Sequence, residues 1–150
     1  MILTIAEILN RNTESAIQAW FDFLQRGEKV ASVPMDYEQR CGHLPQVLRE
    51  LISRLQSSQV IGSKGRVSLA AAKHGLDRCR QGYSAAMLVE ESRMLEVSIF
   101  QTLQNHVASI DFGLVLAAVM VIADEIDSQL SQAIASYTAE SVLDSSPAHA

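Results

Sequence analysis

The sequence predicts an all-α protein, an antiparallel helical bundle of about five helices with a long C-terminal helix. Apolar residues make up 48% of the 150 residues and charged residues only 19%, which supplies one buried core. Glycine and proline are scarce, with seven and three copies, whereas an all-β protein needs many turn residues. Apolar residues also recur at spacings of three and four, the period of one helix face. We expect one domain over residues 1–143 and a polar tail or linker start at 144–150.

Helical signals in the first half of the chain begin near Asn12, a good N-cap, and the first helix is expected to stop at Gly27. Residues 28–35 are expected to form a loop. Asp36 and the glutamine three positions later have the spacing of a capping box, which opens a short helical turn. Pro45 then suits the first position of a helix. The apolar stripe of that helix is the cleanest in the chain and consists of Leu44, Val47, Leu48, Leu51, Ile52 and Leu55.

Three more helices are expected after a glycine- and serine-rich flexible connection at residues 57–65. Ser68 can cap the first of them, which ends at Gly82. Ser84 can cap the second, which runs to about residue 108.

The last helix is expected to start after Asp111 and to run from about residue 112 to residue 142. Its apolar residues step alternately by four and three, the pattern of a heptad seam that packs on one partner helix. The seam consists of Phe112, Leu116, Val119, Ala123, Ile126, Leu130, Ala133 and Tyr137. Residues 112–123 are apolar on every side, so we expect this half of the helix to be buried all round. The partner helix can lie in the same chain or in a second copy, which would make the protein a homodimer.

Composition excludes several classes of partner and location. The 12-residue apolar run at 112–123 is shorter than the roughly 20 residues that a bilayer span requires. The N-terminus lacks the basic region of a signal peptide. A net charge of −5 and the absence of a basic stripe argue against nucleic acid. Cys41 and Cys79 lack a ligand spacing and are interpreted as reduced core residues. We therefore expect a cytoplasmic protein with neither a membrane nor a nucleic-acid partner.

The densest group of unusual polar residues lies at 71–84. His74 and Arg78 are four residues apart and share one helix face. The helices on either side of the Gly82 turn are expected to form an antiparallel hairpin, which brings His74 level with Glu91. Glu91 sits in an apolar stripe with Leu88, Leu95, Ile99 and Thr102, where a carboxylate needs a partner. We predict that His74 or Arg78 pairs with Glu91 and fixes the register of the hairpin.

No pattern in the sequence predicts catalysis, a metal site or a cofactor. His43, His106 and His149 do not have the spacing of metal ligands on one helix. No motif for an activated nucleophile is present. The simplest interpretation of His74 is a hydrogen-bonded structural histidine.

Two other interpretations stay open. His74 can serve as the phosphoacceptor of a histidine-phosphotransfer domain, with Arg78 neutralising the phosphoryl group; this requires a ring nitrogen open to solvent. The chain can instead be a small-ligand-binding helical bundle with a pocket between helices. That pocket would be lined by Trp20, Met87, Met94 and Met120.

One string of residues resembles a known family. The string reads Ala71-Ala72-x-His74-Gly75-x-x-Arg78-x-x-Gln81-Gly82-Tyr83-Ser84, followed by Leu88-x-x-Glu91-x-Arg93-x-Leu95. It is similar to the N-terminal domain of RsbT co-antagonist (RsbRD-type) proteins, and weaker similarity extends over roughly residues 12–140. Ser92 and Glu96 depart from the pattern, since the family usually has an aromatic and a basic residue there.

The resemblance implies an all-helical, dimerising and non-catalytic signal-input domain. Such domains stand at the front of stressosome proteins and bacterial sensor histidine kinases, so it implies a kinase or STAS-type output partner. Related stressosome input domains look like globins that have lost haem, which implies a globin-like arrangement without a cofactor. In this interpretation the seam of the last helix, with Val119, Ile126, Leu130, Ala133 and Tyr137, relays the signal and contributes to the dimer.

Overall fold

The computed structural model describes residues 1–57, 61–62 and 66–145, and these residues are helical throughout most of their length. They form eight α-helices and one 3-10 helix, so the predicted all-α bundle is confirmed. The five longest helices correspond to the five predicted ones: α2 (Thr13–Arg26), α5 (Leu44–Leu55), α6 (Leu69–Arg80), α7 (Ala85–Asn105) and α8 (Phe112–Asp144). The shorter elements are α1 (Ile5–Arg11), α3 (Glu28–Ala31), α4 (Tyr37–Cys41) and the 3-10 helix η1 (Val107–Ser109).

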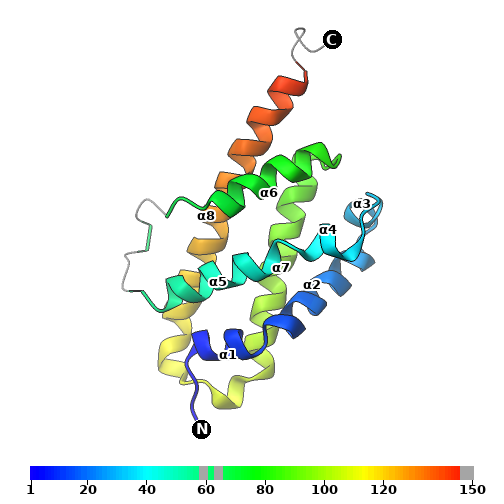
Figure 1. The fold of residues 1–150 in the computed structure, drawn as a ribbon. Helices are drawn as coiled ribbons and strands as arrows, with labels where there is room; N and C mark the ends of the chain where they lie inside the picture. The colour runs from blue at the N-terminus through cyan, green and yellow to red at the C-terminus, as the bar shows by residue number, and fades with distance from the viewer. Residues whose placement is uncertain (58–60, 63–65, 146–150) are drawn as a thin grey trace.

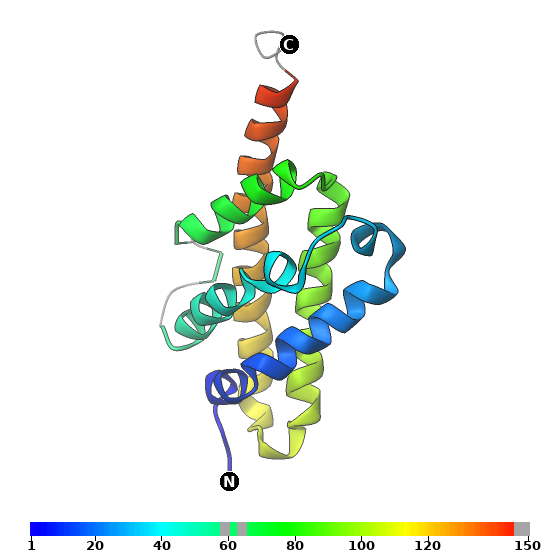
Figure 2. The ribbon, with the colours of Figure 1, turned by 45° about the vertical axis from the view of Figure 1, so that its right-hand side comes forward.

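Helices α7 and α8 form a long antiparallel pair that η1 joins at one end (Figure 1). Helices α1, α2, α5 and α6 cross this pair instead of running alongside it, as both views show (Figure 2). Helix α6 turns into α7 at Gly82, but the predicted antiparallel hairpin of the two helices is wrong, because α6 crosses α7 and makes its most extensive contact with α8. The C-terminal turns of α8 extend beyond the other helices (Figure 1).

Four predicted helix starts are confirmed by side-chain caps, whereas the Asn12 side chain does not cap α2 and donates instead to the Ile8 carbonyl oxygen. Asp36, Ser68, Ser84 and Asp111 each accept a hydrogen bond from a backbone N–H in the first turn of the helix that follows. Gly82 follows the end of α6 with φ +95°, in the left-handed region where glycine carries no Cβ penalty. The tight reversal between α6 and α7 therefore depends on this glycine.

Two short helices were not predicted. Thr4 and Glu7 form a complete capping box at the start of α1, a signal that the sequence does contain. Helix α3 lies in the stretch 28–35 that was expected to be a loop. Most of the predicted connection at 57–65 lies outside the described residues. Of the predicted tail at 144–150, Asp144 ends α8, and residues 146–150 lie outside the described part.

The expectation that residues 112–123 are buried all round is wrong. Phe112 and Leu116 are each 72% exposed and Met120 is 49% exposed, whereas Ala118 and Ile122 are buried. The other helices cover only one side of this part of α8. Apolar residues on every side of a helix show that it can be buried, but the number of neighbouring helices decides whether it is. Among the described residues, no helix combines the length and hydropathy needed to cross a bilayer.

The seam of α8 finds its partner within the chain along its second half. Ile126 and Ala133 are buried, and the Tyr137 hydroxyl donates a hydrogen bond of 2.7 Å to the Tyr83 carbonyl oxygen. Val119 and Leu130 are half-buried. This half of the seam is therefore not a free surface for a second copy.

Candidate functional site

The carboxylate of Glu91 is the centre of a buried polar cluster that we call the Glu91 cluster: Arg40, His43, His74, Arg78, Tyr83 and Glu91. Glu91 is 3% exposed. Arg78 Nε donates to both of its carboxylate oxygens, at 3.0 and 3.1 Å. His74 Nε2 lies 3.2 Å from Glu91 Oε1, and the Tyr83 hydroxyl donates to Oε2 at 2.8 Å. The predicted pairing is confirmed, and it involves both His74 and Arg78 because α6 crosses α7 near Glu91.

These contacts keep the buried carboxylate ionised. Burial alone raises the pKa of Glu91, but the hydrogen bond with His74 and the positive charge of Arg78 outweigh it, so the pKa lies below its ordinary value. Burial, together with the negative charge of Glu91, raises the pKa of Tyr83. Tyr83 therefore stays a neutral phenol that donates to the carboxylate.

Two buried arginines join the cluster to helices α3 and α4. The terminal nitrogens of Arg78 donate to the carbonyl oxygens of Gln39 and Arg40, at 3.0 and 2.7 Å. Arg40 Nη1 donates to the Val30 carbonyl oxygen at 3.0 Å and to the Tyr83 hydroxyl at 2.7 Å. Arg40 was not predicted as a site residue, since its partners lie on other elements and follow no helical spacing. Both guanidinium groups have acceptors, which their burial requires.

His43 is the second histidine of the cluster and was also missed as a site residue. It stands at the start of α5 and stacks on His74, with ring centroids 3.8 Å apart and planes 13° apart. The rings of Trp20 and His43 pack in a T-shaped arrangement with centroids 5.7 Å apart, and Trp20 Nε1 donates to the Glu91 carbonyl oxygen at 3.0 Å. Burial, with smaller effects of His74 and Arg78, holds the pKa of His43 well below its ordinary value. His43 is therefore a neutral imidazole.

His43, His74 and Glu91 have the composition of a metal-ligand set. One ligand atom of each lies within 4.8 Å of the other two. The spacing of the histidines predicts no metal site, because these residues do not lie on a single helix. Here the residues come from the start of α5, from α6 and from α7, so only the packing of these helices brings them together.

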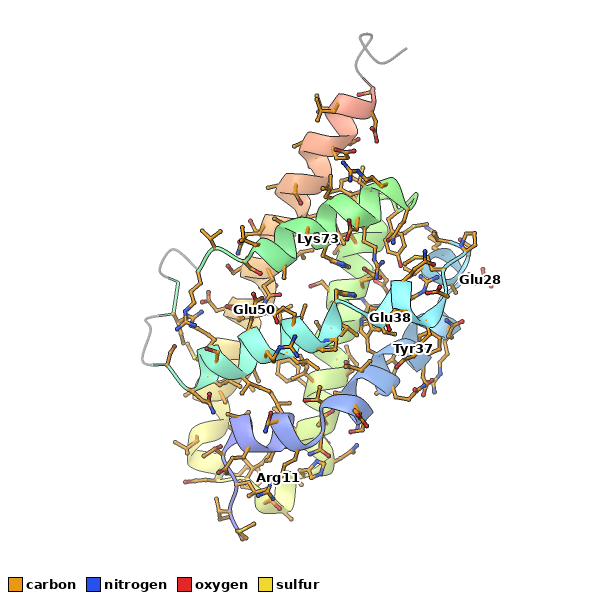
Figure 3. The ribbon with its side chains drawn as sticks, in the orientation of Figure 1. Arg11, Glu28, Tyr37, Glu38, Glu50 and Lys73 are labelled. Atoms are coloured by element: carbon orange, nitrogen blue, oxygen red, sulfur yellow. The ribbon has the colours of Figure 1, made fainter. Side chains whose placement is uncertain are left out.

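The two histidines stand between a small, partly open cavity and a surface cleft. The cavity measures about 50 Å³, and Trp20, Leu88 and Ile126 line it together with both histidines and Glu91. The cleft lies between α4–α5 and α6 and is lined by the same histidines. In Figure 3, Glu38 on α4 and Lys73 on α6 mark the two sides of this cleft.

The predicted pocket of Trp20 and three methionines is not formed. Trp20 lines the small cavity beside the two histidines, whereas Met87 and Met94 line a separate groove beside α3. Met120 is exposed on α8. The sequence showed that these side chains are apolar but not which helix faces meet.

The structure also places the other predicted site residues. Gly75 packs against the backbone of Ala133, which leaves no room for a Cβ at position 75. Arg93 lies at the surface, where it pairs with Glu90 at 2.7 Å, and it takes no part in the Glu91 cluster. The side chain of His74 is 14% exposed and its Nε2 is engaged by Glu91, which argues against the phosphoacceptor role.

The fold and site define an all-α bundle with a buried polar cluster centred on one carboxylate. No profile of a known protein family, no curated protein and no solved structure matches this chain. The resemblance to the RsbRD-type domain stays a prediction that rests on the residues quoted for it.

Proposed function

We propose that the chain is a non-catalytic signal-input and dimerisation domain of a cytoplasmic bacterial signal-transduction system, either stressosome-like or associated with a histidine kinase. The observation that carries the proposal is the direct connection between the Glu91 cluster and α8, the helix that extends out of the bundle (Figure 1). In this function the cluster receives the signal and α8 passes it to an output partner.

Helix α6 supplies most of that connection. The close approach of Gly75 to the Ala133 backbone holds α6 against α8. The Ser136 hydroxyl donates to the Ala72 carbonyl oxygen one turn further on. Because packed helices shift between discrete arrangements instead of deforming continuously, a displacement of α6 is transmitted to α8.

The end of α8 supplies the surface for an output partner. An ion pair of 3.0 Å between Arg80 and Glu140 is close to the last contact of α8 with the bundle. Beyond it Val142 and Leu143 are 64% and 55% exposed. Two apolar side chains on a projecting helix suit a helical partner, such as a kinase or STAS-type output domain.

The dimer part of the proposal uses the exposed face at the start of α8. Phe112 and Val119 line a shallow surface groove together with Phe100 of α7. Residues 112–123 contain no charged side chain, so a second copy meets no like charge when the same face packs on itself. We expect two α7–α8 pairs to form a four-helix interface there.

Hydrogen exchange tests the relay. His74→Gln removes the histidine contact with Glu91, and we expect faster amide exchange in residues 133–144 of α8 as well as in α6. Lys73→Gln is the matched control, since Lys73 is exposed on the same helix. Unchanged exchange in α8 of the His74 variant would count against the relay.

Light scattering at high micromolar concentration tests the dimer. We expect a dimeric mass for the native chain and a monomeric mass for Leu116→Ser. A monomeric native chain would contradict the dimer part of the proposal. It would not bear on the relay from α6 to α8, which the hydrogen-exchange experiment tests.

A further inference from the structure

We infer that His43, His74 and Glu91 form a binding site for a divalent first-row transition-metal cation of the Fe²⁺ to Zn²⁺ group. Two imidazoles and one carboxylate are a ligand set that these cations prefer, and they leave coordination positions open. The inference concerns metal binding alone, and it holds whether or not the chain is a signal-input domain.

The distances suit such an ion without a movement of the helices, but the stacked rings of His43 and His74 must rotate, since an imidazole nitrogen binds a metal in the plane of its ring. Ligand atoms about 2.0–2.2 Å from a tetrahedral Zn²⁺ are about 3.3 Å from one another. His74 Nε2 already lies 3.2 Å from Glu91 Oε1, and a ring nitrogen of His43 lies within 4.8 Å of both ligand atoms. A bound ion replaces the hydrogen bond between His74 and Glu91, so His74 presents a lone pair at Nε2 and carries its proton at Nδ1.

The residues around the proposed site leave His43 available as a ligand and orient the Glu91 carboxylate. His43 Nδ1 is buried and has no hydrogen-bond partner among the described residues. Tyr83 donates to the second oxygen of Glu91 at 2.8 Å, which orients the carboxylate as an outer-shell partner does. Arg78 Nε donates to both oxygens, at 3.0 Å to Oε1 and 3.1 Å to Oε2, so a bound ion shares Oε1 with this donor. The Arg78 charge opposes a cation. Its terminal nitrogens, however, donate to backbone carbonyl oxygens, which take up part of that charge.

The site has an entrance and an open side. Both histidines line the surface cleft between α4–α5 and α6, through which a hydrated ion can approach. They also line the partly open cavity of about 50 Å³, which has room for water as a further ligand. The remaining coordination positions therefore face a small space lined mainly by apolar side chains.

The test is titration of the chelator-treated native chain with Co²⁺ and Zn²⁺. We expect one Co²⁺ per chain by native mass spectrometry, with the visible absorption bands of a cobalt site of low coordination number. Trp20 is the single tryptophan of the chain and packs on His43, so Co²⁺ should quench its fluorescence. Zn²⁺ should displace Co²⁺ and restore the fluorescence. The absence of saturable one-to-one binding in the native chain would overturn the inference.

Variants locate the site. His43→Gln and His74→Gln should each lower the Co²⁺ affinity by more than about 100-fold, since loss of an outer-shell partner alone costs about 10–100-fold. A double variant, His106→Gln with His149→Gln, removes the other two of the four histidines and should bind as the native chain does. Circular dichroism checks that each variant is folded. Native affinity in folded His43 and His74 variants, or loss of binding in the double control, would overturn the assignment; if a variant fails to fold, the native titration decides.

Discussion

The Glu91 cluster and the first half of α8 distribute polarity in opposite ways. Glu91 and Arg78 are charged and buried, at 3% and 1% exposure. Phe112 and Leu116 are apolar and each 72% exposed. Each region therefore departs from the usual pattern of charged surfaces and apolar interiors.

The two regions differ in whether other residues of the same chain offset the unfavourable burial or exposure. Each charged group of the cluster has a partner, which offsets the high cost of removing it from water. No described segment covers the exposed face of α8, and burial of such side chains would contribute about 1.5–3 kcal/mol each. The charged groups of the cluster are thus paired within a single copy, whereas the exposed face of α8 is not covered by any described segment.

The largest effect is expected when the cluster loses its carboxylate. Glu91→Ala leaves the Arg78 guanidinium buried without its anionic partner, which should lower the free energy of unfolding by about 3–5 kcal/mol. Urea unfolding followed by circular dichroism measures this loss. A loss below about 1 kcal/mol is typical of a solvent-exposed ion pair, so it would show that water reaches Glu91 and Arg78.

A smaller loss is expected from Gly75→Ala at the contact that joins the cluster to α8. The added Cβ meets the Ala133 backbone, which cannot turn aside as a side chain can, so we expect a loss of about 1–3 kcal/mol in urea unfolding. Gly27→Ala is the matched control, because its Cβ would come no closer than 3.5 Å to another atom and its φ is −89°. We expect the stability of this control to be unchanged or raised by up to about 1 kcal/mol. A Gly75 variant as stable as the control would contradict the close approach of α6 to α8.

Glu96 lies on α7 near Asp127 of α8, and its charge should be mildly destabilising. Burial raises the pKa of Glu96, and the negative charge of Asp127 on α8 raises it further. The folded state therefore holds the proton more tightly than the unfolded state. Glu96 is most favourable below its unfolded pKa, and its stability contribution is lost as the pH rises through its folded pKa.

We accordingly expect Glu96→Gln to gain less than about 1 kcal/mol at pH 7 and nothing near pH 3, measured by urea unfolding at both values. Glu90→Gln should show the opposite sign at pH 7, because the hydrogen bond with Arg93 outweighs burial and lowers the pKa of Glu90. Equal signs for the two variants at pH 7 would contradict this interpretation of the charges.

The smallest effect on stability is expected on the exposed face. Leu116→Ser should change the unfolding free energy of the monomer by no more than about 0.5 kcal/mol, since the side chain is mostly in water. Unfolding at low protein concentration measures the monomer. A loss of several kcal/mol at this dilution would mean that the side chain is buried in a single copy.

Local signals predicted much of the fold and part of the site. Capping residues such as Ser68 and Ser84 act within one turn, so the helix starts followed from neighbouring residues alone. His74, Arg78 and Glu91 could be grouped because a helix period and one turn relate them. His43 and Arg40 could not, since no local pattern links them to α6 and α7.

The sequence by itself determined the all-α class, the positions of the five long helices and the need of Glu91 for a cationic partner. These features depend on helical periodicity, capping and the cost of burying a charge, which act over short distances along the chain. Only the tertiary structure decided that His43 stacks on His74, that α6 packs closely on α8, and that Phe112 and Leu116 face outward. The physical reason is that these features depend on how the helices cross one another, and an apolar helix face carries no record of which neighbour will cover it.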